Sequence, residues 1–331
     1  MKTKLNFTGQ AYDSSVILIW LPLFLVLGLL VTGTQAIASS ACAQTSKAAL
    51  AACTSSATSD YWLGIGACDN LSDRQERQNC IDEARHSLNK EDLKTCNEQF
   101  QARQEVCRDL GGGPYDPDFS SENFVSNPAD LTGNSYFPLT PGTYTYKSKD
   151  TAGNTLQTIV VRVKDDTTTI AGVLCRVVTD KVYEGAGTGG RLLEDTIDWY
   201  AQDSDGDVWY FGETTIAFTF DEAGNPTAST EGSWMAGMDE AKPGIIMFSV
   251  PEDQIGLLFR QEFALGTAED LGRVIGTDAS VTAGGVKYTG CVHTQDSTPL
   301  EPGVIEDKYY TPGVGLVLTV DPDGTREELI P

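Results

Sequence analysis

From about residue 137 to the end of the chain, short apolar runs alternate with turn residues. Val, Ile, Thr, Tyr, Phe and Trp are grouped into runs, and Gly, Asp, Asn and Pro separate them. This pattern predicts successive β-hairpins. We therefore expect residues 136–331 to form a mainly β fold, an antiparallel β-barrel or sandwich of about 8–10 strands. The clearest runs are 142–150, 155–165, 168–184, 245–250, 256–265, 285–295 and 313–321.

Residues 68–110 have a different, helical composition. Glu, Gln, Arg, Lys and Leu dominate, and β-branched residues are rare. Ser72 and Gln75 form a capping-box pattern, and Asn89 is a candidate N-cap for a second helix. We expect an α-helical hairpin that turns near residues 88–89. Its apolar stripe is thin, so burial alone would not stabilise it.

Cysteine usage suggests how this hairpin is held. The chain has eight cysteines, six of them between Cys42 and Cys107, and only two histidines with no C-x-x-C motif, which disfavours structural zinc. In a hairpin that turns near 88–89, the cysteines should pair in nested order. The expected bridges are Cys68–Cys107 and Cys80–Cys96, with Cys42–Cys53 across an Ala-rich segment and Cys175–Cys291 in the β domain.

The N-terminus has the features of an export signal. Lys2 and Lys4 precede the apolar run 16–31, and Ala36-Ile37-Ala38 offers a small-x-small cleavage pattern. The run is shorter than the ~20 residues of a membrane span. A lipid anchor at Cys42 is a disfavoured alternative, since Ser39 stands where such sites need Leu.

Four parts follow from these patterns. They are a signal peptide (1–38), a cysteine-rich helical module (39–110), a linker rich in Gly, Pro, Asp, Ser and Asn (111–135), and the β domain (136–331). We expect a secreted, periplasmic or cell-envelope protein. The module is expected to act as a spacer or docking piece.

The formal net charge is −24, and residues 111–331 hold 13 basic and 35 acidic residues. A field of this sign repels phosphate, so nucleic acid and anionic membrane surfaces are excluded as partners. Solubility is one explanation of the acidity, and cation binding is the other. A small ligand, a cation or a protein partner remains open, as does the oligomeric state.

The strongest candidate site lies in the hairpin of residues 191–213. Asp205-Gly206 predicts a two-residue turn, which would place Asp198 directly opposite Glu213 on one face, beside Tyr200 and Phe211. The alternative is a three-residue bulged turn, which would shift the register by one residue and separate the pair. Like charges opposite each other destabilise a sheet unless a base, a cation or a shared proton compensates. The face could be solvated, paired with Arg, or a catalytic or metal-binding carboxylate pair.

Two further features of this hairpin suggest ligands. Trp199, Tyr200, Trp209 and Phe211 are candidates to line a pocket for an apolar ligand or a sugar. Asp203, Asp205 and Asp207 at the tip are candidate calcium ligands, although their spacing is not that of an EF-hand. Ordinary turn chemistry is the competing explanation. Calcium is the one cofactor that the sequence suggests.

The acidic half resembles a group of uncharacterised secreted bacterial β-domain proteins. The resemblance rests on DWYAQDSDGDVWYFGE (198–213), GSWMAGMDEAKPGIIMF (232–248), RQEFALGTAED (260–270) and PLEPGVIEDKYYTPGVGLV (299–317). The KYYTPGVGLV tail looks like the closing strands of envelope β-proteins of lipoprotein type. The resemblance implies an exported β domain and carries no established activity.

Together these patterns predict an exported, non-catalytic protein of the envelope or the extracellular space, which binds a ligand or a cation or has a structural role. The alternative is a hydrolase that uses Asp198 and Glu213. The two differ in whether the carboxylate pair lies in a pocket with a raised pKa.

Overall fold

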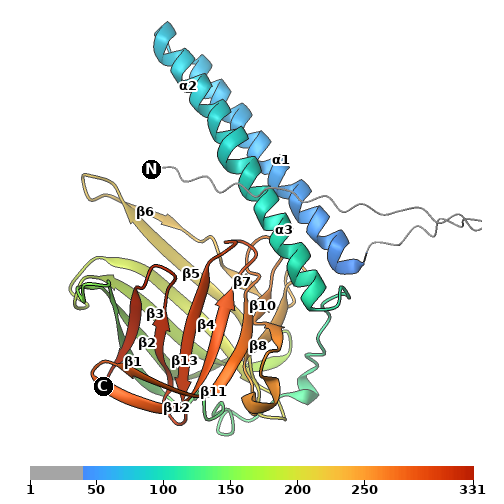
Figure 1. Cartoon of the computed structure of the whole chain (residues 1–331), viewed down its shortest axis with the longest axis vertical. Coiled ribbons are helices and arrows are strands. Elements are labelled where there is room, and N and C mark those ends of the chain that lie inside the picture. Colours follow the sequence, from blue (N-terminus) through green and yellow to red (C-terminus); the bar gives the residue numbers. More distant parts are fainter. Residues whose placement is uncertain (1–39) are drawn as a thin grey trace, which may run out of the picture. The chain divides into compact units, whose positions relative to one another are not determined.

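The computed structural model describes residues 40–331 (Figure 1). The predicted signal peptide lies outside the described residues. Among the described helices, none combines the length and the apolar character that a membrane crossing requires.

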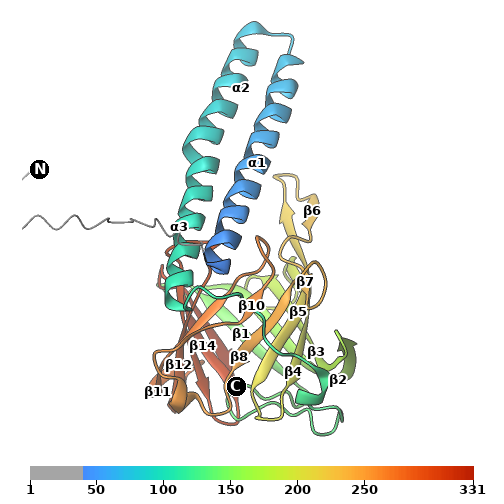
Figure 2. The ribbon, with the colours of Figure 1, turned by 90° about the vertical axis from the view of Figure 1, so that its right-hand side faces the viewer.

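Two long antiparallel helices form the N-terminal part of the described chain (Figure 2). Helix α1 covers Ala41–Asp69, and α2 (Arg74–Ser87), the π-helical turn η1 (Leu88–Asp92) and α3 (Leu93–Asp109) continue into one another as a second helix of 36 residues. The expected turn at 88–89 is therefore wrong. The chain turns between Asp69 and Arg74, where the Asp73 carboxylate caps α2 by accepting a hydrogen bond from the Glu76 N–H at 2.8 Å.

Three disulfides join these two helices in nested order. Their Cα–Cα distances are 5.6, 5.7 and 5.6 Å. Because the turn is near residue 71 rather than 88, the predicted bridges Cys68–Cys107, Cys80–Cys96 and Cys42–Cys53 are wrong. The observed pairs are Cys42–Cys107, Cys53–Cys96 and Cys68–Cys80.

The predicted bridge Cys175–Cys291 is also absent. Both thiols are free and 0% exposed. Cys175 lies on β3 and Cys291 on β12, two strands that are not neighbours in the sheet. Burial raises the pKa of the Cys175 thiol, which keeps it protonated and unreactive.

The rest of the chain is a mainly β fold, as the sequence predicted, with 15 antiparallel strands in one sheet that is not closed. The predicted 8–10 strands were too few. The apolar run 168–184 is divided by a hairpin turn at Ala171-Gly172, and several strands are too short to produce a recognisable pattern. The ends of the main strand order, β10 and β9, are separated along the chain by Gln261 alone. The strands are β1 (Gly142–Lys149), β2 (Thr155–Ile170), β3 (Val173–Glu184), β4 (Leu192–Gln202), β5 (Val208–Phe220), β6 (Pro226–Ser229), β7 (Trp234–Met235), β8 (Lys242–Met247), β9 (Leu258–Arg260), β10 (Glu262–Phe263), β11 (Leu271–Ala283), β12 (Val286–Ser297), β13 (Ile305–Thr311), β14 (Gly315–Val320) and β15 (Arg326–Ile330).

The segment 111–135, expected as a linker, takes part in the core. It holds the 3-10 turn η2 (Ser121–Asn123), and Phe124 and Leu131 are 7% and 0% exposed. Phe124 packs edge-to-face on Trp209 and Phe211 of β5. Although the segment is mostly polar, the buried side chains of Phe124 and Leu131 attach it to the sheet.

Disulfide mapping tests the observed pairing. Peptides from the non-reduced protein should join Cys42 to Cys107, Cys53 to Cys96 and Cys68 to Cys80, and Cys175 and Cys291 should react with a thiol reagent only after unfolding. Replacing Cys53 and Cys96 together by Ala should lower the free energy of unfolding by roughly 2–4 kcal/mol. Recovery of a Cys68–Cys107 peptide would contradict the pairing.

Candidate functional site

Strands β4 and β5 form the hairpin that the sequence singled out. Asp198 lies opposite Glu213, Thr196 opposite Thr215, and Glu194 opposite Ala217, as predicted. The turn itself differs from the prediction. The Asp203 N–H donates to the Asp207 carbonyl at 3.0 Å, which leaves three residues in the loop, with Gly206 at a φ of 90°.

A β-bulge at Phe211 compensates for the longer loop. Tyr200 pairs with Tyr210, and Trp199 pairs with Gly212, so Phe211 is the extra residue. Gly212 has a φ of 133°, and a Cβ there would lie 2.5 Å from the Trp234 carbonyl oxygen. Only glycine fits this position. The bulge therefore preserves the Asp198–Glu213 pair. It also places Tyr210, and not the predicted Phe211, beside Asp198.

Asp198 is buried at 8% exposure, and its carboxylate accepts a hydrogen bond from the Tyr210 hydroxyl at 2.6 Å. Burial raises the pKa of Asp198 well above its usual value, the Tyr210 bond opposes this, and Glu213 adds to it. Burial also raises the pKa of Glu213 to about 7. A solvated face and an Arg-paired face are thus both excluded for Asp198.

Asp198 lines a cavity of about 280 Å³, which we call the acidic chamber. Its other charged walls come from distant strands: Asp180 from β3, Lys308 from β13 and Glu327 from β15. Tyr146, Tyr200 and Tyr310 also line it, among aliphatic residues. Glu213 is not part of this lining.

The chamber has an excess of carboxyl groups. Burial raises the pKa of Asp180 and of Glu327 to about 7 each, and neighbouring acids add to both effects. Lys308 is already paired, at 3.0 Å from Asp296 and 3.3 Å from Glu306. The Asp180 Oδ1 atom is buried and has no hydrogen-bond partner among the described residues. Such an orphaned acceptor is costly unless a ligand or water supplies a donor.

The four aromatic candidates do not form one pocket. Tyr200 lines the acidic chamber and stacks on Tyr210 with ring centroids 4.9 Å apart. All four pack in one hydrophobic cluster with Phe124, but Trp199, Trp209 and Phe211 do not line the acidic chamber. Of the four, Tyr200 alone lies beside the carboxylates.

At the hairpin tip, the Asp203 carboxylate is occupied by donors from the chain. It accepts bonds from the N–H groups of Asp205 and Asp207 at 3.0 and 2.9 Å and from Trp209 Nε1 at 2.8 Å. Asp207 accepts from the Ser249 N–H at 2.7 Å. Among residues 40–331 no group of three or more His, Cys, Asp or Glu side chains is arranged to hold a metal ion. Calcium binding at this turn stays a prediction.

Sequence reasoning missed Asp180, Lys308 and Glu327. The one available signal was an acid at an inward position of a strand, as in Val178-Thr179-Asp180, where alternation places Asp180 on the face of buried Val178. Nothing in the sequence joins β3, β13 and β15 around one cavity.

No model of a protein family matches the chain, and no curated protein sequence matches it. Two solved structures are similar to it. One is described as a "putative lipoprotein" from Parabacteroides distasonis (13% identity, 60% of this chain and 97% of the other, TM-score 0.32). The other is described as a "putative exported protein with YmcC-like fold" from Bacteroides fragilis (14% identity, 59% of this chain and 97% of the other, TM-score 0.33). At these scores the likeness carries no functional argument. The three disulfides are typical of an oxidising, extracytoplasmic compartment.

The pKa shifts in the chamber predict how stability depends on pH. Folding raises the pKa of Asp180 from 3.8 to about 7, so the folded state holds this proton more tightly than the unfolded state. Protonation of Asp180 therefore contributes to the free energy of unfolding. This contribution is complete below about pH 4 and is lost as the pH rises through about 7. In denaturant melts, the free energy of unfolding should fall less between pH 5 and pH 8 for Asp180→Asn than for the wild type.

Exposed Asp205 provides the control for this comparison. Asp205→Asn should keep the wild-type difference between the two pH values. An Asp180→Asn protein with the same pH dependence as the wild type would mean that Asp180 is not protonated in the folded state.

The turn chemistry makes a separate prediction. Asp203→Ala should lower the free energy of unfolding by roughly 1–3 kcal/mol, because three donors lose their acceptor, whereas Asp205→Ala should cost little. Thermal melts with calcium and with a chelator provide the measurement. A calcium-induced rise in Tm that disappears in both variants would show instead that the tip binds calcium.

Proposed function

We propose that this is an exported, non-catalytic binding protein whose acidic chamber holds a small organic cation. The observation that carries the proposal is the buried, unpartnered Asp180 Oδ1 atom in a cavity with two further carboxyl groups, Asp198 and Glu327. An organic cation supplies a positive charge, and its N–H or O–H groups supply donors, where the chain lacks them. Its binding would also favour the ionised carboxylates.

An organic cation suits the cavity better than a metal ion. The carboxyl groups come from separate strands, and the described residues contain no preformed metal-ligand group. Tyrosine rings line the chamber, and aromatic faces attract quaternary and primary ammonium groups. Lys308 is held by Asp296 and Glu306 and so is not the cation that Asp180 needs.

A hydrolase is the second candidate. The raised pKa values of Asp198 and Glu213, which face each other across two strands, favour it. Against it, the Tyr210 hydroxyl already occupies the Asp198 carboxylate at 2.6 Å, and Glu213 does not line the chamber. A non-catalytic role therefore accounts for more of the geometry.

Thermal melts with choline test the proposal, with 3,3-dimethyl-1-butanol as its uncharged isostere. Choline should raise Tm, and the rise should be larger at pH 8 than at pH 5, because Asp180 and Glu327 are then ionised. Asp180→Asn should lose the shift, and the surface variant Asp205→Asn should keep it. The uncharged alcohol should have no effect.

Equal shifts with choline and the alcohol, or no shift with choline and other small ammonium ions, would exclude cation binding in the chamber. Turnover of ester or glycoside substrates that disappears in Asp198→Asn would establish the hydrolase instead.

A further inference from the structure

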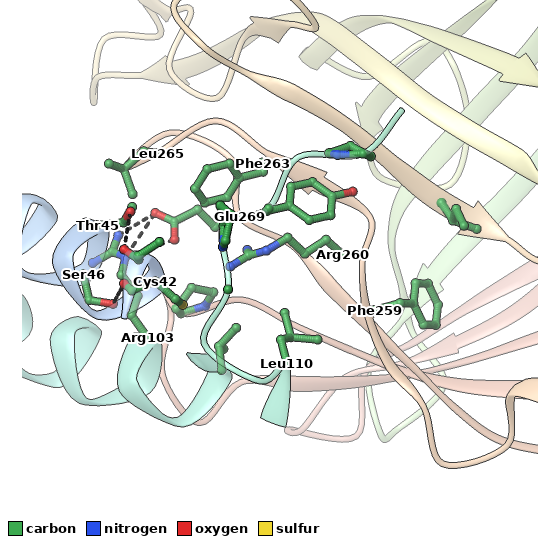
Figure 3. Close-up of a pocket in the computed structure, with 18 of the residues that line it drawn as sticks. Cys42, Thr45, Ser46, Arg103, Leu110, Phe259, Arg260, Phe263, Leu265 and Glu269 are labelled. Atoms are coloured by element: carbon green, nitrogen blue, oxygen red, sulfur yellow. Dashed lines mark hydrogen bonds and ion pairs between the residues drawn. The ribbon is translucent and has the colours of Figure 1, made fainter. Parts of the chain in front are cut away.

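A second cavity, of about 430 Å³, lies where the helical hairpin meets the sheet (Figure 3). We call it the junction pocket. Its walls come from the first turns of α1, from α3 and the segment after it, and from β8, β9 and β10. Most of the lining is apolar or aromatic, including Val106, Leu110, Ile245, Phe259, Phe263 and Leu265.

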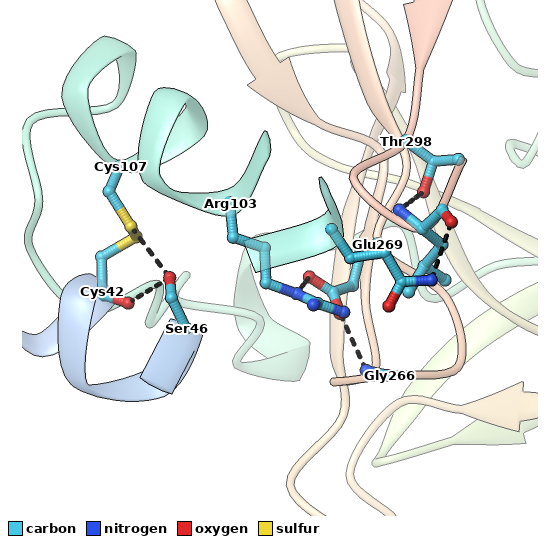
Figure 4. A network of polar contacts seen from close by, with 9 residues as sticks. Cys42, Ser46, Arg103, Cys107, Gly266, Glu269 and Thr298 are labelled. Carbon is cyan, nitrogen blue, oxygen red and sulfur yellow. Dashed lines mark hydrogen bonds and ion pairs between the residues drawn. A yellow bond between two sulfur atoms is a disulfide. The ribbon is translucent and has the colours of Figure 1, made fainter. Parts of the chain in front are cut away.

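Three charged side chains line the junction pocket, and two of them neutralise each other. Arg103 of α3 donates to Glu269 from Nε at 3.1 and 3.0 Å and from Nη2 at 2.7 Å (Figure 4). Both side chains are buried, at 6% and 2% exposure. The Gly266 N–H also donates to Glu269, at 2.8 Å. This pair is complete without a ligand.

The third charge, Arg260 of β9, has no such partner. It is 9% exposed, and its Nε and Nη1 atoms have no hydrogen bond to any described residue. Its guanidinium lies over the Phe263 ring at 4.5 Å and the Tyr115 ring at 5.4 Å. Figure 3 shows it extending into the pocket toward Glu269. Burial lowers the pKa of Arg260, although Glu269 partly opposes this, so the cation is poorly compensated.

We infer that the junction pocket binds an amphiphilic carboxylate, a single negative charge on an apolar tail. The pocket lining carries two positive charges and one negative charge, which leaves a deficit of one anion. A carboxylate beside Arg260 would supply the acceptors that Nε and Nη1 lack, in the geometry that guanidinium favours. The apolar walls would cover the tail, and the volume lies in the range of small-molecule sites.

The helix ends do not compete for the carboxylate. At the start of α1 the Cys42 N–H donates to the Gly112 carbonyl and the Ala43 N–H to the Ser40 hydroxyl. Arg260 is therefore the group that recognises the anion. The Cys42–Cys107 bridge and the Ser46 hydroxyl bonded to the Cys42 carbonyl at 2.9 Å hold the helical wall in place (Figure 4). A preformed wall reduces the entropy cost of binding.

Titration with dodecanoate tests the inference, with dodecanol and dodecyltrimethylammonium as the uncharged and cationic analogues, all below their micellar concentrations. Isothermal titration calorimetry measures the three affinities. Dodecanoate should bind at least about tenfold more tightly than dodecanol, as a charge-assisted hydrogen bond in a buried site implies. Dodecyltrimethylammonium should bind more weakly than either.

The variant Arg260→Met separates the charge from the fold. It should lose roughly tenfold to hundredfold in affinity for dodecanoate, keep the affinity for dodecanol, and melt at or above the wild-type temperature, because an uncompensated buried charge is removed. Arg191→Met is the matched control, since Arg191 pairs with Glu184 at an exposed site outside this lining.

Arg191→Met should bind dodecanoate as the wild type does. Equal affinities for dodecanoate and dodecanol, or an Arg260→Met protein that retains dodecanoate, would overturn the inference. If Arg260→Met does not fold, its Tm reveals this, and the comparison of the three amphiphiles on the wild type decides alone. The result is independent of cation binding in the acidic chamber.

Discussion

The buried ion pair between Arg103 and Glu269 connects the helical hairpin to the β-sheet. The three disulfides hold the helices to each other, and none of them reaches the sheet. Arg103 crosses that boundary with three hydrogen bonds to one carboxylate, supported by an exposed pair between Arg273 and Asp109 and by the bond from Gln99 to the Leu300 carbonyl. Removal of one partner would leave an uncompensated buried charge, which typically costs about 3–5 kcal/mol. The position of the hairpin, and with it one wall of the junction pocket, depends on this contact.

The two cavities have opposite electrostatic character. In the acidic chamber, burial raises the pKa of Asp180 and of Glu327 to about 7, so these carboxyl groups can take up protons and reduce their mutual repulsion as the pH falls below neutrality. In the junction pocket, a guanidinium cannot lose its charge in the same way, because its ordinary pKa lies far above neutrality. Protonation can therefore remove charge from the chamber, although Asp180 Oδ1 still lacks a hydrogen-bond donor, whereas Arg260 stays charged and poorly solvated. This difference explains why the two sites should respond differently to pH.

The sequence predicted both the class of fold and the Asp198–Glu213 pair. The first prediction rested on a correct pattern, whereas the second rested on an incorrect turn. The β domain followed from alternation and turn residues, and the structure confirms its class. The Asp198–Glu213 pair was correct even though the predicted turn was wrong, because the bulge at Phe211 restores the register that the longer loop shifts. This bulge depends on the close contact between Gly212 of β5 and the Trp234 backbone of β7, which the sequence of the hairpin does not reveal. The chamber and the junction pocket draw on strands and helices far apart in the chain, so no local pattern could predict them.

The six cysteines of the helical hairpin show how an error in the position of one turn changes every predicted disulfide bond. Nested pairing was the right rule, but Asn89 lies within a continuous helix, where its side chain donates to the Arg85 carbonyl instead of capping. In the observed order the bridges close loops of 12, 43 and 65 residues in sequence separation. Along the chain, Cys42, Cys53 and Cys68 all precede the cysteines with which they pair. Once α1 forms, Cys42 and Cys53 are about 16 Å apart along it and cannot join. The finished helix α1 therefore keeps its own cysteines apart, and each of them can reach only a cysteine on the second helix.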